Sequence, residues 1–551
     1  MRFLGINAVF HDPAAALVID GEIVAAAEEE RFSRRKHGKE PVPFSTWELP
    51  EQAARWCLES AGITPEELDG IAYSYDPSLV RDGQEGLDTA WEGLRTLYAL
   101  RASAFLQTVL PGFDAEKVHH IPHHVAHAAS AGLAAPPTGG RRDCAVFVAD
   151  GRGEDASHLA GVYRDGRLEI LARQRLPHSL GLLYEELTAH LGFRRSSDEY
   201  KVMALASSGT PRFVNDLHEL IRHEGDGHIR IEPVDLHAFA KSRTPGTECS
   251  AEHADLAASV QRRMEEVLLE LTGWLYERTG EPRLAMAGGV ALNCVANTRI
   301  AEESPFEHVW VQPAAGDAGT ALGGALHLAQ EAGEEIVPMR GADLGRGWSD
   351  DELAAVLETA EVPFERPDDL GETVAAALAR NELVAWFQGR SEYGPRALGR
   401  RSLLANPAYP GNLDRLNDVK GREKFRPVAP MVTAERAPEV FSRGPLPSPY
   451  MLFVHDVADE WADRIPAVVH TDGTARVQTV DAAEFPLLAR LLYRFEAHTG
   501  IPVLINTSLN TAGRPMVDSP RDALECFGSA PVDLLALGPF VVRRAGVHGR
   551  R

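Results

Sequence analysis

Cysteine and long apolar runs are scarce in this chain of 551 residues, and each scarcity excludes a class of protein. The five cysteines are odd in number and form no C-x-x-C pair, which argues against a disulfide framework and against a thiolate zinc cluster. No apolar run approaches the ~20 residues that a membrane span needs, and no basic N-terminal region precedes a long apolar stretch. We therefore expect a cytoplasmic protein with no membrane partner.

Positive charge is also in short supply. The chain carries 56 basic and 80 acidic residues, a formal net charge of -24, and only seven of the basic residues are lysines. Such a surface repels a polyphosphate backbone, so we expect no nucleic-acid partner. It would attract a cationic ligand, although an acidic surface also serves solubility alone.

Apolar sequence is plentiful enough for several cores. The apolar fraction of 44% and the mean hydropathy of -0.20 are ordinary for globular proteins. At about 150 residues per domain, the length predicts three or four structural units.

One strand pattern occurs twice along the chain. Residues 2–30 are typical of a strand, a polar loop, a second strand, a turn at Asp20 and Gly21, and a third strand. Residues 145–173 repeat this plan, with the turn at Asp165 and Gly166. The repeat indicates an internally duplicated α/β unit, whose ligands are expected in the crevice between the two halves.

A domain boundary is expected where periodicity is lost, between Val337 and Trp348. A helix start follows, with Ser349 as its N-cap. We predict a first domain over residues 1–345, with its second subdomain beginning near residue 143, and a second α/β domain over residues 346–551. In the latter, the segments LVAWF, YMLFVHDV and PVLINTS are expected strands.

Two histidines stand four residues apart in the segment IPHHVAHAASAG. If a helix begins near Pro122, His123 and His127 lie on one helix face, a spacing at which two imidazoles can share one metal ion. The same spacing also suits a polar helix face with exposed histidines, so further ligands are needed to decide.

Two aspartates lie in loops where such ligands could come from. Asp150 ends the strand AVFVAD, and Asp317 opens a helix of very small residues. Carboxylates at strand ends of a duplicated cleft suit a divalent cation, but Asp is equally common in turns and as a helix N-cap. The glycine turn at Gly288 and Gly289 precedes another helix, where backbone N–H groups can approach a phosphate.

Basic residues concentrate between Arg390 and Arg426, a segment that contains nine basic and four acidic residues. Glycines and prolines interrupt this run, so it predicts a turn-rich pocket for a compact anion such as phosphate rather than a solvated helix face. The segment LINTSLN, residues 504–510, adds the neutral side chains Asn506 and Ser508 at a strand end.

Ten ordered motifs between residues 10 and 515 give the chain a resemblance to a known family, the O-carbamoyltransferases of natural-product biosynthesis, which act on aminoglycosides, cephalosporins, ansamycins, glycosylated macrolides and Nod factors. The motifs are FHDPAAALV, EEERFSRRKHG, HHVAHA, DGRGE, DEYKVMALA, GGVALN, GDAGTALGGAL, EYGPRALGRRSLLANP, KGREKFRPVAP and INTSLNTAGRP.

The resemblance implies a fold and a reaction. The fold would be α/β, with an N-terminal duplicated actin-like (ASKHA) domain similar to the catalytic subunit of tRNA threonylcarbamoyl transferase, and a C-terminal YrdC-like α/β domain. The reaction would form carbamoyl adenylate from carbamoyl phosphate and ATP and then transfer the carbamoyl group to a hydroxyl of an antibiotic or similar metabolite, with a sugar hydroxyl the first expectation.

The resemblance also carries roles over to single positions. It implies a metal site for Fe²⁺ or another divalent cation, formed by His123, His127, Asp150 and Asp317. It implies that carbamoyl phosphate and the adenylate are bound by Arg396, Lys420, Arg426, Arg476, Asn506 and Ser508. Of these, Arg396 and Lys420 are implied to be catalytic. In the first domain, the residues implied to face the adenylate are Lys36, Gly288, Gly289 and Asn293.

His11, in the first polar loop, is the candidate base for the acceptor hydroxyl, because an imidazole titrates near working pH. A role for Mg²⁺ and a homodimer stay open. Two alternative functions also stay open: a tRNA threonylcarbamoyl transferase fused to its adenylate-forming partner, against which the net charge argues, and an ATP-binding regulator without transfer chemistry.

Overall fold

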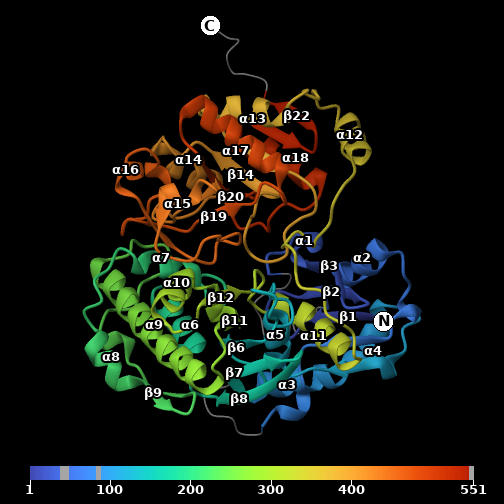
Figure 1. Cartoon of the computed structure of the whole chain (residues 1–551), viewed down its shortest axis with the longest axis vertical. Helices are drawn as coiled ribbons and strands as arrows, with labels where there is room; N and C mark the ends of the chain where they lie inside the picture. The colour runs from blue at the N-terminus through green and yellow to red at the C-terminus, as the bar shows by residue number, and fades with distance from the viewer. Residues whose placement is uncertain (38–48, 82–88, 545–551) are drawn as a thin grey trace. The chain divides into compact units, whose positions relative to one another are not determined.

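The computed structural model describes residues 1–37, 49–81 and 89–544, so that Gly38 of the EEERFSRRKHG motif lies outside it. The chain divides into two compact units, Met1–Gly341 (unit 1) and Ala342–Arg551 (unit 2), which are drawn in Figure 1. No helix among the described residues combines the length and the apolar character that a membrane crossing requires.

The division between the units falls four residues before the predicted boundary at 345. Residues 342–346 belong with unit 2 because their backbone is bonded to its loops. The carbonyl of Ala342 accepts a hydrogen bond from Tyr393 N at 2.7 Å, and Gly345 N donates to the carbonyl of Ser391 at 2.9 Å. These bonds extend unit 2 upstream of the segment where periodicity returns in the sequence.

Unit 1 contains two five-stranded sheets with the same topology, ordered β3-β2-β1-β4-β5 and β8-β7-β6-β11-β12. In each sheet the first three strands form an antiparallel meander and the last two run parallel to the first strand. The strands of the first sheet are Arg2–Asn7, Ala14–Ile19, Glu22–Glu28, Gly70–Tyr73 and Val118–His120 (β1 to β5). Those of the second are Cys144–Ala149, Ala156–Arg164, Arg167–Arg175, Arg283–Ala287 and His308–Val311 (β6, β7, β8, β11, β12). The predicted duplication is thereby confirmed.

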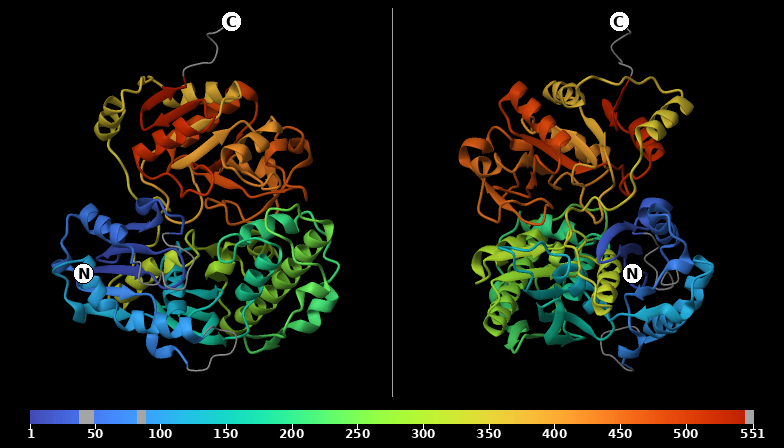
Figure 2. Two further views of the ribbon diagram at one scale, coloured as in Figure 1. Left: turned by 180° about the vertical axis from the view of Figure 1, so that it is seen from behind. Right: turned by 45° about the vertical axis from the view of Figure 1, so that its right-hand side comes forward.

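Two central helices lie between these sheets, and each covers the sheet of the other half. Helix α5 (His123–Gly132) follows the first sheet but packs on β6, β7 and β11, whereas α11 (Ala318–Glu331) follows the second sheet and packs on β1, β2 and β4. The two helices also pack on each other (Figure 1). On the outer sides, α2 (Glu51–Ala61) covers β2 and β3, and the long helix α9 (Ala251–Thr279) packs on β6 and β7, seen from behind in Figure 2.

Glycine makes the close approach of the central helices possible. A Cβ atom on Gly323 of α11 would stand 1.7 Å from the carbonyl oxygen of Ala126 on α5. A Cβ atom on Gly5 of β1 would stand equally close to the carbonyl oxygen of Ala321 on α11. The small residues that fill α11 therefore serve backbone contact with both neighbours.

Unit 2 is built on a seven-stranded mixed sheet ordered β19-β15-β20-β14-β13-β21-β22. Helices α13 and α17 pack together, α17 on β15 and β20 and α13 on β13 and β21, while α18 lies on β13 and β21. The strands in chain order are Val384–Phe387, Arg401–Ala405, Ala429–Thr433, Gln478–Val480, Val503–Ser508, Leu534–Leu537 and Phe540–Arg543 (β13, β14, β15, β19 to β22). The main helices are Asp350–Thr359, Leu370–Ala379, Gly411–Val419, Pro486–Thr499 and Pro520–Ser529 (α12, α13, α14, α17, α18).

Most expected elements of unit 2 are present, and one strand is not. Ser349 caps α12 as predicted, and its hydroxyl accepts a hydrogen bond from Glu352 N. The segment YMLFVHDV, residues 450–457, was expected to be one strand, but only His455–Val457 is (β17), in a small sheet with Phe441–Ser442 (β16) and Thr474–Ala475 (β18). The expectation is wrong because Met451 has a φ of 57°, which breaks an extended backbone.

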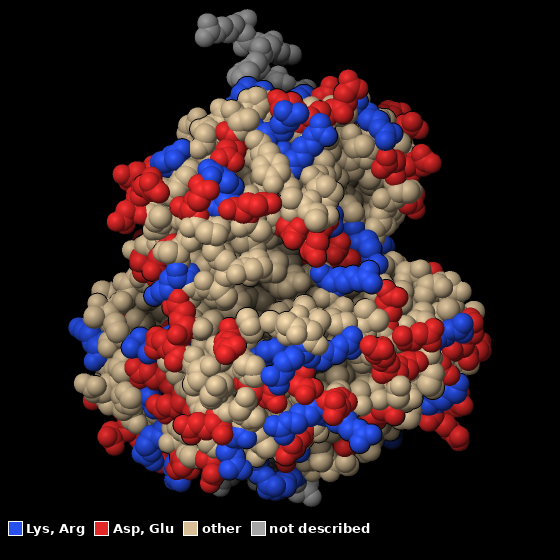
Figure 3. Space-filling model, in the orientation of Figure 1, with Lys and Arg blue, Asp and Glu red and all other residues tan. Residues whose placement is uncertain are grey.

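Charged side chains of both signs are mixed on the face shown in Figure 3, where the described residues form no continuous basic surface.

The carboxylate of Glu29, directly after β3, is buried. Its oxygens accept hydrogen bonds from Ala53 N at 2.9 Å and from the amide of Gln52 at 3.0 Å, which ties the strand end to α2. Burial raises the pKa of Glu29 to about 7, because two hydrogen bonds replace only part of the lost hydration.

Gly323→Ala should destabilise unit 1 by about 1–3 kcal/mol, because the added methyl group forces α5 and α11 apart. The matched control is Gly273→Ala in the interior of α9, where a Cβ atom would meet nothing within 4 Å. That change should stabilise the helix by about 0.5–1 kcal/mol. Calorimetric unfolding of the two variants measures whether their changes in stability have opposite signs. An equal effect of both substitutions would contradict the packing argument.

The pKa of Glu29 predicts a pH dependence of stability. Since the pKa in the folded state lies above the ordinary value of 4.5, the folded state binds more protons between pH 4.5 and 7, and stability falls as pH rises through that range. Glu29→Gln keeps an acceptor and removes the titration. Between pH 5 and pH 8, we expect the free energy of unfolding of the unmodified protein to fall by about 1–3 kcal/mol relative to that of this variant. Denaturant unfolding at both pH values measures the difference, and a constant difference would refute the assignment.

Candidate functional site

Helix α5 holds His123 and His127 inside unit 1. It begins directly after Pro122, as predicted, and its first amide, His123 N, donates to the carboxylate of Glu154 at 2.8 Å. The two histidines follow one another by one helical turn, their ring centroids are 4.7 Å apart, and both are completely buried. An exposed polar helix face is therefore excluded as the explanation of this motif.

Asp150 and Asp317 converge on the same point from other elements. Asp150 follows β6, and its Oδ2 lies 3.4 Å from His123 Nε2 and 3.9 Å from His127 Nε2. Asp317 stands at the start of α11, and its Oδ1 lies 3.6 and 3.5 Å from the same two nitrogens. The side chain of Asp317 makes no capping bond to α11, so capping does not explain it.

The second oxygen of each carboxylate is anchored to backbone. Oδ1 of Asp150 accepts a hydrogen bond from Gly289 N, and Oδ2 of Asp317 accepts one from His11 N, both at 3.0 Å. Each aspartate thus has one oxygen fixed by an N–H group and the other turned toward the histidines. The loops that supply these N–H groups follow β1 and β11.

Strong electrostatic coupling follows from burying these groups together. Burial alone would lower the pKa of His123, but the carboxylates of Asp150 and Asp317 raise it well above its ordinary value. In turn, burial would raise the pKa of Asp150 and of Asp317, but the adjacent histidines hold both pKa values below their usual range. The cluster therefore favours negative carboxylates in a place with little water.

The donor atoms of the cluster fit a divalent cation. One ligand atom from each of His123, His127, Asp150 and Asp317 lies within 4.8 Å of every other, and the Nε2 atoms of both histidines have no hydrogen-bond partner. Buried polar atoms without partners are rare and call for an explanation. Two imidazoles and two carboxylates form a mixed N,O donor set of the kind that binds Fe²⁺ and similar ions.

The loop after β1 carries His11 to the edge of this cluster. Its backbone is fixed by Asn7, whose amide donates to the carbonyls of His11 at 2.6 Å and of Asp12 at 3.0 Å. The ring of His37 bonds the Asp12 carboxylate at 2.9 Å, so Lys36, the preceding residue, lies beside the same loop. His11 is thus next to Asp317 through its N–H, while Lys36 lies near the loop and has no contact described with the four residues of the cluster.

The glycine turn after β11 positions Asp150, and its predicted approach to a phosphate stays a prediction. Gly288 has a φ of 95°, and a Cβ atom there would meet the carbonyl of Ala149 at 2.2 Å, so only glycine fits. The N–H of Gly289 donates to the carboxylate of Asp150 at 3.0 Å. Asn293 caps α10 (Cys294–Glu303) by accepting from Ala296 N, and its amide donates to Gln261. The turn therefore positions Asp150.

One residue near the cluster was not among the predicted ligands. His124 is buried, neither of its ring nitrogens has a hydrogen-bond partner, and its Nε2 lies 3.6 Å from Asp150 Oδ2. Adjacent helical positions point in different directions, so the sequence spacing gave no reason to include it. Glu154 was missed likewise, although it lies in the quoted motif DGRGE.

In unit 2 the predicted anion-binding residues lie on segments that come together at one end of the sheet. Strand β20 runs antiparallel to β14 and β15, with Asn506 opposite Leu404 and Ala429. The end of β20 therefore lies beside the starts of β14 and β15, and β19 runs parallel to β15 next to them. We call this end of the sheet the basic strand end; it comprises Arg396, Lys420, Arg426, Arg476, Asn506 and Ser508.

Contacts within the basic strand end are partly internal. Lys420 Nζ donates to the carbonyl of Ser508 at 2.6 Å and to its hydroxyl at 2.9 Å, which brings an ammonium group to the end of β20. Asn506 is buried, and its amide donates to the carbonyl of Ala397 at 3.1 Å and to Gln478 at 2.6 Å. Asn506 thus holds the loop that carries Arg396, instead of offering a free donor.

Several members of the basic run have structural tasks, so the run as a whole is not one pocket. Arg401 is buried and donates to the carbonyls of Gln388 at 2.8 Å and Gly389 at 3.1 Å. Arg400 is paired with Asp343 at 2.8 Å, and Lys424 is paired with Asp418 at the surface. Fewer positive charges are therefore available to a ligand than the number of basic residues in the run suggests.

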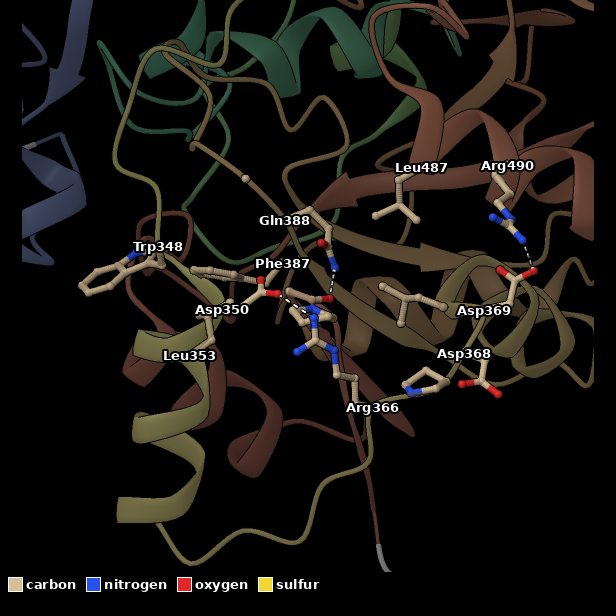
Figure 4. Close-up of a pocket in the computed structure, with 15 residues that line it drawn as sticks. Trp348, Asp350, Leu353, Arg366, Asp368, Asp369, Phe387, Gln388, Leu487 and Arg490 are labelled. Carbon is tan, nitrogen blue, oxygen red and sulfur yellow. Dashed lines mark hydrogen bonds and ion pairs between the residues drawn. The ribbon is translucent and has the colours of Figure 1, made fainter.

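The cavity shown in Figure 4 lies elsewhere in unit 2. It has a volume of about 540 Å³, and the described residues that line it include none of the basic strand end. Its two arginines are already paired, Arg366 with Asp350 at 2.9 Å and Arg490 with Asp369 at 2.6 Å. Both guanidinium groups that line this cavity are thus engaged by carboxylates, and the cavity is not the pocket that the basic run of the sequence predicts.

Known proteins match the chain over nearly its whole length. Residues 2–326 match the family model described as carbamoyltransferase N-terminus, and residues 375–544 match the one described as carbamoyltransferase C-terminus. An uncharacterized protein of Synechocystis sp. is 38% identical, over 98% of this chain and 97% of its own. The nodulation protein NolNO of Sinorhizobium fredii is 36% identical, over 98% of this chain and 80% of its own. Among solved structures, HypF of T. kodakarensis is similar at 15% identity and a TM-score of 0.37, over 61% of this chain and 49% of that one.

Proposed function

Since the chain belongs to the carbamoyltransferase family, and so is an enzyme that transfers carbamoyl groups, we propose that it is an ATP-dependent O-carbamoyltransferase that works in two steps. One observation supports the two-step scheme: each unit has its own cluster of polar and charged side chains. The set in unit 2 suits phosphate oxygens, and the set in unit 1 suits a cation. A single-step enzyme would need only one of them.

The first step is assigned to the basic strand end of unit 2. Water cleaves carbamoyl phosphate into phosphate and carbamate, and a carbamate oxygen then attacks the α-phosphorus of ATP, which forms carbamoyl adenylate and releases pyrophosphate. Arg396, Arg426 and Arg476 supply guanidinium groups suited to phosphate oxygens, and Lys420 adds an ammonium group beside Ser508. Asn506 acts indirectly by holding the loop of Arg396.

The second step is assigned to unit 1. The acceptor hydroxyl oxygen bonds to the carbamoyl carbon, the bond from that carbon to the phosphate oxygen breaks, and AMP leaves. His11 accepts the hydroxyl proton, since its loop lies at the edge of the cluster. Lys36, beside that loop, faces the negative adenylate.

A divalent cation, for which Fe²⁺ is our first choice, would be held by His123, His127, Asp150 and Asp317. When bound, it supplies positive charge next to phosphate and carbonyl oxygens. The protein's own part is to keep the four ligands dry and oriented, through Gly289 N on Asp150 and His11 N on Asp317. We propose a small hydroxylated metabolite as acceptor, with a sugar hydroxyl as the first group to test.

Arg396→Ala should reduce carbamoyl-phosphate-dependent release of pyrophosphate from ATP by about 100-fold or more, because a charged donor to the reacting anion is lost. The matched control is Lys424→Ala, which removes an exposed positive charge from the same basic run and should leave the rate within about 3-fold. A coupled pyrophosphate assay measures both. Normal release by the Arg396 variant would contradict the assignment of the first step.

His127→Ala should weaken binding of a divalent cation by about 100-fold or more, since it removes a direct ligand. His119→Ala, which changes an exposed histidine of β5, should bind the cation normally. Elemental analysis of the purified proteins and titration with Fe²⁺ under anaerobic conditions give the measurement. If the His127 variant keeps the metal content and affinity of the unmodified protein, the metal site is refuted.

A further inference from the structure

A hydrogen-bonded turn of unit 2, His470 to Thr474, lies outside every role assigned so far. The ring nitrogen Nδ1 of His470 is 3.0 Å from the hydroxyl oxygen of Thr474, and that hydroxyl is 2.7 Å from the carboxylate of Asp472. The backbone closes the same turn, because His470 N donates to the carbonyl of Thr474 at 2.7 Å. The imidazole is thus fixed at both its backbone and its ring.

This network decides which ring nitrogen carries the proton. A carboxylate has no proton to give, so the Thr474 hydroxyl must donate to Asp472 and can only accept from His470. The proton therefore sits on Nδ1. The other nitrogen, Nε2, presents a bare lone pair, which no described residue contacts as a hydrogen-bond donor.

The imidazole stays neutral at working pH. Burial lowers the pKa of His470 to about 4, an effect that the nearby guanidinium of Arg476 adds to and the carboxylate of Asp472 opposes. The turn and the guanidinium are also close in the chain, since Ala475 alone separates Thr474 from Arg476. A neutral hydrogen-bond acceptor is thus carried by the turn that precedes Arg476, one of the residues of the basic strand end.

An acceptor is unusual in a site built for an anion. A bare lone pair repels phosphate oxygens, which the guanidinium and ammonium groups bind instead. The one part of carbamoyl phosphate that can donate a hydrogen bond is its amide group. Carbamate keeps the same amide after the phosphate has left.

We propose that Nε2 of His470 accepts a hydrogen bond from the amide N–H of the carbamoyl group and thereby selects carbamoyl phosphate over acyl phosphates that lack an amide. This assignment rests on the proposed function of unit 2 and names the residue that determines its substrate. Acetyl phosphate, which has a methyl group in place of the amide, is therefore the comparison substrate for a test. A site that hydrogen-bonds a substrate N–H rejects an analogue without it, because the acceptor is then buried without a partner.

Two substitutions separate the two nitrogens of the ring. His470→Asn keeps a donor near the position of Nδ1 and removes the acceptor at Nε2, whereas His470→Gln can place an amide oxygen near the position of Nε2. The experiment measures pyrophosphate release by the full chain with ATP and either carbamoyl phosphate or acetyl phosphate. Titration calorimetry of each acyl phosphate without ATP gives the affinity separately.

We expect the Asn variant to lose about 10- to 100-fold in kcat/KM for carbamoyl phosphate, while its activity with acetyl phosphate does not fall. The Gln variant should retain most of the preference. Thr474→Val, which keeps His470 but frees the proton of Nδ1 to move to Nε2, should weaken the preference in the same direction.

Different results contradict different claims. If the Asn variant keeps the preference for carbamoyl phosphate, or loses both substrates equally, His470 is not the selecting residue, although the proposed first step stands. If the unmodified protein releases no pyrophosphate with carbamoyl phosphate, the proposed function fails, and this assignment fails with it.

Discussion

The close packing of α5 against α11 is the constraint on which unit 1 depends. Each helix covers the sheet of the other half, so the two halves cannot separate without exposing both cores. Gly323 allows the backbones to touch at Ala126, and this contact brings the start of α11, with Asp317, to the side of α5 that carries His123 and His127. The fold and the ligand cluster are therefore two results of one helix contact.

Burial is the reason why the cluster of His123, His127, Asp150 and Asp317 calls for a bound cation. Two imidazoles and two carboxylates lose most of their hydration here, and the histidine Nε2 atoms receive no hydrogen bond in return. Placing charged and polar groups in such a site costs stability unless they are paired or bind a metal. The backbone amides of Gly289 and His11 fix one oxygen of each aspartate and so orient the other toward the histidines.

Unit 2 handles charge in a different way, at the end of a sheet. Four strands bring together residues from four separate segments, because the end of β20 lies beside the starts of β14 and β15, and β19 runs parallel to β15 on its other side. The cations there are accompanied by positioning groups such as Asn506 and by the uncharged ring of His470. A binding site for a small anion with one amide group needs both kinds of contact, since charge alone does not distinguish one acyl phosphate from another.

Local sequence determined much of this protein. Hairpin turns at Asp20–Gly21 and Asp165–Gly166 revealed the duplication, the spacing of His123 and His127 placed them on one helix, and ordered motifs indicated the family. These features depend on neighbours in the chain, which a sequence displays directly. Only the tertiary structure decided which nearby residues belong to a site. It brought His124 and Glu154 to the cluster of His123, His127, Asp150 and Asp317, gave Arg400 and Arg401 partners within the protein, and used Gly289 to hold Asp150. The reason is physical: burial and pairing of a charge depend on residues that are distant in the chain, and no local pattern records them.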